Sequence, residues 1–70
     1  MSKRKPQPGE IQQMDTERLL RLYRAACERL RDAGGWRDAP MASAWAGQIC
    51  TELDARGEFD TVLRIEAECK

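Results

Sequence analysis

The spacing of apolar side chains over residues 14–35, "MDTERLLRLYRAACERLRDAGG", constrains the fold more than any other feature of the sequence. Asp15 stands where a helix cap is expected, and Gly34 supplies the left-handed residue that ends many helices. At about 3.6 residues per turn, charged side chains share one side of this helix and apolar ones share the other. The apolar side consists of Leu19, Leu20, Leu22, Tyr23, Ala26, Cys27 and Leu30. Because this side is wide, we expect the helix to pack against two neighbours.

A second helix is predicted over residues 38–57, "DAPMASAWAGQICTELDARG". Asp38 is expected to cap it, and Pro40 suits its first turn, where the missing amide costs nothing. Gly57 is expected to end it. Large apolar side chains recur at every fourth position and predict a stripe that faces the core. They are Met41, Trp45, Ile49 and Leu53.

Residues 58–70 carry two competing patterns. Asp60 is placed to cap a third helix. The side chains expected to pack inward from that helix are Val62, Leu63 and Ile65. From residue 63 to residue 70, however, apolar and polar residues alternate strictly, which is typical of a strand. A single strand would have no partner in this chain, and Ala and Glu are poor strand residues, so we predict a helix.

These elements predict an all-α fold over residues 14–70. We expect one small two- to three-helix domain, made of a helical hairpin and a short C-terminal helix. Residues 1–13 are expected to be a flexible basic tail with little to bury. Its basic residues are Lys3, Arg4 and Lys5.

The two halves of the chain carry opposite charge. Residues 1–37 contain nine basic and five acidic groups, a net charge of +4, whereas residues 38–70 contain three and seven, a net charge of −4. A core built from 70 residues is also near the lower limit of stability. The oppositely charged halves can pair within one chain that folds back on itself or head to tail between two chains, and we expect a homodimer.

The composition argues against most enzyme chemistry. The chain has no histidine, so Ser-His and Cys-His nucleophilic systems and histidine metal sites are absent from the sequence. It also lacks a glycine-rich phosphate-binding loop. Cys27, Cys50 and Cys69 are odd in number and lack C-x-x-C spacing, which favours free thiols in a reducing cytoplasm. We expect no enzyme activity, cofactor, metal or membrane span, and a cytoplasmic location.

One side of the predicted second helix carries only small, uncharged residues where a solvent-facing side normally carries charge. These residues are Ser43, Ala44, Gly47 and Thr51. A glycine in mid-helix costs about 1 kcal/mol relative to alanine, which suggests that another backbone approaches closely. We predict that this side binds a protein, with the first or third helix of the same chain as the alternative cover.

The turn between the first two helices holds Trp36 and Arg37, residue types that are enriched at binding hot spots. We therefore add both to the predicted protein-binding residues, although Trp36 could equally plug the end of the helix pair. The expected function is a non-enzymatic protein-binding module, a small helical adaptor or inhibitor that docks on a larger protein. Small chains of this kind are common among phage and mobile-element proteins.

Residues 48–65, "QICTELDARGEFDTVLRI", resemble the helix-turn-helix pattern of DNA-binding proteins over about a quarter of the chain. The resemblance implies that Thr61 and Arg64 contact bases. The link between the two helices is longer than the usual tight turn, and three carboxylates on the second would repel phosphates, so we interpret the match as helix–loop–helix patterning. A small DNA- or RNA-binding regulator is the alternative function. Its candidate residues are Lys3, Arg4, Lys5, Arg18, Arg21 and Arg64.

Overall fold

The protein is an all-α domain with three α-helices and no strand among residues 6–7 and 9–69, which are the residues that the computed structural model describes. The helices are α1 (Thr16–Ala33), α2 (Pro40–Ala55) and α3 (Phe59–Glu68), with short 3-10 turns at Ile11–Gln13 and Trp36–Asp38. The alternating segment after residue 63 is therefore helical up to Glu68, not a strand. Within the described residues, no helix combines the length and the apolar character needed to cross a membrane.

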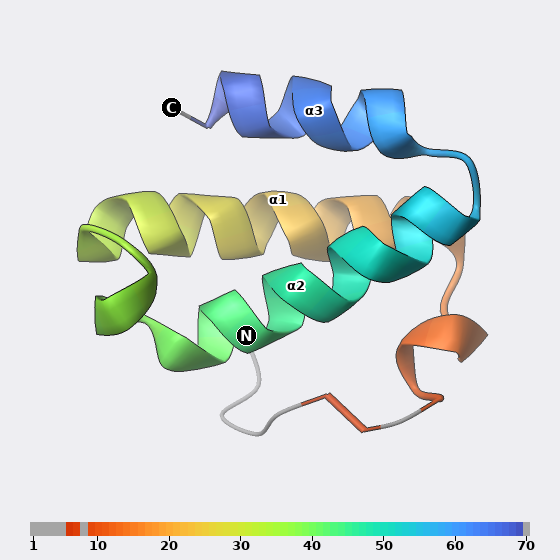
Figure 1. Ribbon diagram of the computed structural model, residues 1–70, viewed down its shortest axis with the longest axis horizontal. Helices are drawn as coiled ribbons and strands as arrows, with labels where there is room; N and C mark the ends of the chain where they lie inside the picture. The colour runs from red at the N-terminus through yellow and green to blue at the C-terminus, as the bar shows by residue number, and fades with distance from the viewer. Residues whose placement is uncertain (1–5, 8, 70) are drawn as a thin grey trace.

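The three helices form a flat molecule of 29 × 26 × 15 Å. Helices α1 and α3 run in the same direction, and α2 returns obliquely across α1 (Figure 1). As a result, α2 and α3 lie close together at their connection and diverge away from it. Helix α1 contacts both of them, as the width of its apolar side predicts.

Helix α1 begins and ends where the sequence predicts. Asp15 is its N-cap residue, although its side chain makes no capping hydrogen bond, and Gly34 follows its last turn with a φ of 90°. The Gly34 amide donates to the Arg31 carbonyl and the Gly35 amide donates to the Leu30 carbonyl, which satisfies two otherwise free carbonyls. Leu19, Tyr23 and Ala26 are its buried residues.

Helix α2 differs from the prediction at its start. Its N-cap residue is Ala39, because Asp38 belongs to the preceding 3-10 turn and does not cap the helix. Trp45, Ile49 and Leu53 are buried, as predicted, but Met41 is 36% exposed. Each four-residue step rotates the stripe by about 40°, so its first member has left the core-facing side. The smaller Ala42 and Ala46 are buried instead.

Helix α3 starts one residue before the predicted cap, so Asp60 lies in its first turn and Glu58 is the N-cap residue. Val62 and Ile65 are buried, as predicted. Leu63 is 47% exposed, so the prediction that it packs inward is wrong. The buried side follows the helical spacing of Val62, Ile65 and Cys69, which leaves Leu63 on the opposite side.

The folded part of the chain begins before Met14, earlier than the sequence predicts. Ile11 is only 4% exposed and belongs to the core cluster, and the 3-10 turn that holds it contacts α2. A single isoleucine among polar residues creates no periodic pattern, which is why the sequence places it in the tail. The predicted flexibility of residues 1–5 and 8 lies outside the described residues and stays a prediction.

Arg56 connects the N-terminal segment to the ends of two helices. Its Nε donates to Glu52 Oε2 at 2.7 Å, one terminal nitrogen donates to Thr16 Oγ1 at 3.1 Å, and the other donates to the Gln12 carbonyl at 3.1 Å. The guanidinium thereby holds the start of α1, the end of α2 and the segment before α1 together. Lysine has no planar fork and cannot reproduce this set of bonds.

Replacing Ile11 with alanine is expected to lower the free energy of unfolding by about 2–4 kcal/mol, because a buried aliphatic side chain is lost and a cavity remains. Met41→Ala is the control, since a side chain that is 36% exposed contributes much less. Urea titration followed by circular dichroism measures both. Equal effects of the two variants would contradict a core role for Ile11.

Candidate functional site

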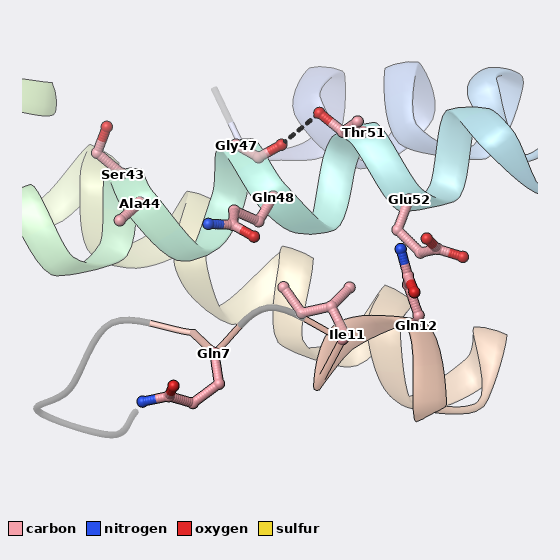
Figure 2. Close-up of a pocket in the computed structure, with 10 residues that line it drawn as sticks. Gln7, Ile11, Gln12, Ser43, Ala44, Gly47, Gln48, Thr51 and Glu52 are labelled. Carbon is pink, nitrogen blue, oxygen red and sulfur yellow. Dashed lines mark hydrogen bonds between the residues drawn. The ribbon is translucent and has the colours of Figure 1, made fainter.

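The predicted protein-binding side of α2 forms one wall of an open groove of about 510 Å³ (Figure 2). The other wall comes from the N-terminal segment, which lies alongside α2. We call this site the α2 groove. Its lining residues are Gln7, Gly9, Ile11, Gln12, Ser43, Ala44, Gly47, Gln48, Thr51 and Glu52.

Neither α1 nor α3 covers Gly47 on this side of α2. A Cβ built on Gly47 would meet nothing within 4 Å, and both Gly47 and Thr51 are exposed. Ser43 and Ala44 are partly exposed. The alternative that another helix of the same chain packs against this glycine is therefore wrong.

Thr51 offers the groove a methyl group and not a free hydroxyl. Its Oγ1 donates to the Gly47 carbonyl at 2.9 Å, one helical turn earlier (Figure 2). This bond satisfies the hydroxyl within α2. The wall formed by α2 consequently presents small and mainly apolar groups at Ala44, Gly47 and Thr51. A ligand can therefore approach close to the helix backbone.

Three glutamines line the groove, and the side chain of Gln7 points away from α2. Gln7 and Gln12 come from the N-terminal segment and Gln48 comes from α2 (Figure 2). All three are exposed, and within the described residues their side-chain amides make no hydrogen bond. An amide both donates and accepts hydrogen bonds, which matches the alternating donors and acceptors of a peptide backbone.

Among the described residues, Glu52 is the one ionisable residue in the lining, and it is paired. Its carboxylate accepts from Arg56 at 2.7 Å, and the two side chains are 20% and 22% exposed. The same arginine is bonded to the Gln12 carbonyl, so it joins the two walls at this end of the groove. None of the described lining residues is therefore left with an unpaired charge.

Of the other two predicted protein-binding residues, only Arg37 has a described side chain. Trp36 and Arg37 lie in the 3-10 turn that precedes α2, and Arg37 is exposed. Arg37 is absent from the lining of the groove. The side chain of Trp36 lies outside the described part of the structure, so its predicted burial or exposure stays untested.

The arginines of the alternative nucleic-acid site are partly brought together. Arg21 and Arg64 line a shallow groove of about 560 Å³ between α1 and α3, whereas Arg18 does not line it. Arg21 pairs with Glu17 at 2.8 Å. Glu28 and Glu68 line the same groove, so its charge is mixed. Lys3, Arg4 and Lys5 lie outside the described residues.

A second hollow, which the sequence does not predict, opens where α2 and α3 diverge above α1. It has a volume of about 440 Å³, and all three cysteines line it together with Tyr23, Leu30, Ala46, Gly47 and Glu66. We call it the thiol hollow. Cys27 lies on α1, Cys50 lies on α2, and Cys69 directly follows α3.

The polar group of the thiol hollow is a hydrogen-bonded pair. The Tyr23 hydroxyl donates to Glu66 Oε1 at 2.5 Å. Burial, followed by this hydrogen bond, raises the pKa of Tyr23 above its ordinary value of 10.0. Burial also raises the pKa values of Cys27 and Cys50 above 9.0, so these thiols stay protonated at neutral pH.

The thiol hollow does not have the arrangement of a metal site. Among the described residues, no three histidine, cysteine, aspartate or glutamate side chains are placed so that they could hold one ion. The thiols are free, and their surroundings are mostly apolar. The hollow therefore suits an apolar group that enters from outside.

No protein-family model matches the chain, and comparisons with curated proteins and with solved structures find no significant match.

Replacing Gly47 with alanine is expected to raise the free energy of unfolding by about 1 kcal/mol, because alanine has the higher helix propensity and its Cβ meets open space. Gly34→Ala is the matched control. Gly34 has a φ of 90°, so alanine is strained there and stability should fall by about 1 kcal/mol. Thermal and urea unfolding measure both, and a destabilised Gly47→Ala variant would show that the site is covered.

Stability is expected to fall as the pH rises above about 9. The folded chain keeps the protons of Cys27, Cys50 and Tyr23, whereas the unfolded chain releases them near their ordinary pKa values of 9.0 and 10.0. Above pH 10, Tyr23→Phe should remove about 1.4 kcal/mol per pH unit from this slope. Urea titrations at pH 8, 10 and 11 test the expectation, which fails if both proteins show the same slope.

Proposed function

We propose that this chain is a non-enzymatic protein-binding module that holds a polypeptide segment of a larger partner in the α2 groove. The observation that carries the proposal is the uncovered small-residue wall of α2, centred on Gly47, beside glutamine amides that have no partner within the described residues. In this role the chain acts as a small helical adaptor or inhibitor, of the kind found in phages and mobile elements.

The chemistry of the groove favours a peptide as its occupant. Small side chains allow a second backbone to approach closely and to gain dispersion contacts along its length. The amides of Gln12 and Gln48 can pair with main-chain N–H and C=O groups, which every peptide offers regardless of its sequence. A volume of about 510 Å³ is that of a site for a few residues.

The same features support a role without catalysis. The lining holds one carboxylate, Glu52, and Arg56 already pairs with it. General acid–base catalysis needs a group that is free to exchange its proton with a substrate. We further propose that the protein works in the cytoplasm, where free cysteines stay reduced, and that it forms a homodimer.

Nucleic-acid binding remains the alternative function. The groove that holds Arg21 and Arg64 also holds carboxylates, and Arg21 is already paired with Glu17. An arginine that is already paired, such as Arg21, releases few counterions, and the carboxylates repel phosphates, so this groove is a weak phosphate site. Binding to DNA or RNA that persists at physiological salt and declines steeply as salt increases would favour the alternative.

A displayed library of random peptides, selected on the wild-type protein, tests the proposal. The selected peptides should lose at least about tenfold in affinity for Gly47→Leu and for Ala44→Leu, because both substitutions fill the groove and leave the core intact. Ala55→Leu is the control, since Ala55 is exposed at the end of α2 and does not line the groove. Calorimetric titration of synthetic peptides measures the affinities.

Two results would overturn the proposal. One is a library that yields no peptide with measurable affinity for the wild type. The other is a set of peptides that bind Gly47→Leu and Ala44→Leu as tightly as they bind Ala55→Leu. Circular dichroism spectra of all three variants should match the wild type, which separates a blocked groove from a lost fold.

A further inference from the structure

Helix α3 exposes an apolar stripe to solvent. Phe59 is 50% exposed and Leu63 is 47% exposed, and the exposed Ala67 continues the stripe one turn later. These two are among the three large hydrophobic residues that the described structure leaves exposed, and the third, Met41, lies on α2. Large apolar side chains spaced four residues apart on one helix favour contact with another surface.

The thiol hollow lies beside this stripe on the same helix. Glu66, on its rim, follows Phe59 by seven residues, which is two helical turns and about 10 Å along the axis. Phe59 and Glu66 therefore point to nearly the same side of α3. The exposed Phe59 ring and the thiol hollow therefore lie on nearly the same side of α3, about two helical turns apart.

We propose that a second copy of the chain covers this face, with the two α3 helices antiparallel across a two-fold axis. In this arrangement Phe59 of each copy enters the thiol hollow of the other. A two-fold axis requires a surface that is complementary to itself, which a projection and a hollow on one helix provide. The axis passes beside Val62 and Leu63, which lie midway between Phe59 and Glu66.

The charges beside the stripe fit the same register. Asp60 and Arg64 are exposed on the flank of the stripe away from Glu66, and neither has an ion-pair partner within the described residues. Their midpoint is Val62, half a residue from the midpoint of Phe59 and Glu66, so the antiparallel pairing brings Asp60 of each copy close to Arg64 of the other. Two ion pairs of opposite direction then border the apolar contact, and they select this register over a shifted one.

The area that a stable dimer must bury indicates that the thiol hollow is part of the interface. A half-exposed phenylalanine presents about 100 Å² of apolar surface, whereas a stable interface buries about 800 Å² per partner. Two α3 helices alone fall well short of that area. Insertion of Phe59 into the thiol hollow adds surface from α1 and α2, including Leu30 and Cys50.

This inference does not depend on the proposed peptide site. The α2 groove and the thiol hollow lie on different sides of α2 and share only Gly47 among their lining residues. A chain that dimerises without binding peptides, or that binds peptides as a monomer, would separate the two proposals.

Sedimentation equilibrium of the wild type and of Phe59→Glu, over micromolar to millimolar concentrations, tests the dimer. The substitution should raise the dimer dissociation constant by about 100-fold or more, because it removes the aromatic anchor and places a carboxylate against Glu66. It should leave the fold intact, since an acidic residue in the first turn of α3 interacts favourably with the helix dipole. Met41→Glu is the control, because Met41 is exposed on another helix.

Charge reversal tests the register. Asp60→Arg and Arg64→Asp should each weaken the homodimer by roughly tenfold, because each places like charges opposite one another. An equimolar mixture of the two variants should dimerise as the wild type does, because every position 60 then faces an opposite charge at position 64. Charge pairing within a single helix cannot produce this rescue by mixing.

A wild type that stays monomeric up to millimolar concentration overturns the proposal. So does a dimer that survives Phe59→Glu, which would place the interface elsewhere on the molecule. Failure of the mixture to recover the dimer, with both single variants weakened, contradicts the antiparallel register. Mass spectrometry under native conditions identifies the mixed dimer directly by its mass.

Discussion

The three helices are joined by four aliphatic side chains that have almost no contact with water: Leu19, Ile49, Leu53 and Val62. Leu19 lies near the start of α1, Leu53 near the end of α2, and Val62 near the start of α3. These three helix ends meet on one side of the molecule (Figure 1). Burial of such a side chain contributes about 1.5–3 kcal/mol, so this contact fixes where the helices converge.

Because the three helices converge at one end, a gap opens between α2 and α3 at the other end. Since α2 crosses α1 obliquely and α3 follows α1, the gap between α2 and α3 widens away from the contact (Figure 1). The residues available to fill it are small, with Ala46, Gly47 and Cys50 on α2 and Cys27 on α1. They leave a hollow of about 440 Å³. The thiol hollow is thus a consequence of a tight contact at one end and small side chains at the other.

Local signals in the sequence predict the helices well. Gly34 ends α1 as expected, and Trp45, Ile49 and Leu53 form the core side of α2. The errors at Met41 and Leu63 share one cause. Hydrophobicity predicts that a side chain prefers burial, but the angle between packed helices decides which part of an apolar arc is covered.

Only one of the two walls of the α2 groove can be predicted from the sequence. Four residues of the α2 wall stand out in the sequence because small, uncharged side chains replace the expected charges. The opposite wall depends on Ile11, whose burial follows from its contact with a helix that lies far along the chain. Likewise, Cys27, Cys50 and Cys69 are separated by about twenty residues each, so their meeting in one hollow follows only from the tertiary fold.

Gly47 lines both the α2 groove and the thiol hollow, and it makes α2 less stable than alanine would. Alanine would stabilise α2 by about 1 kcal/mol, and its Cβ would meet no neighbouring atom of the described residues within 4 Å, so no described contact inside the chain requires glycine. Under the proposed function, the glycine serves a contact with a partner outside the chain. A side chain at this position would stand at the border of both the α2 groove and the thiol hollow, where it would keep a second backbone away from the helix. A glycine that weakens its own helix without relieving any internal contact is what a surface built for close approach contains.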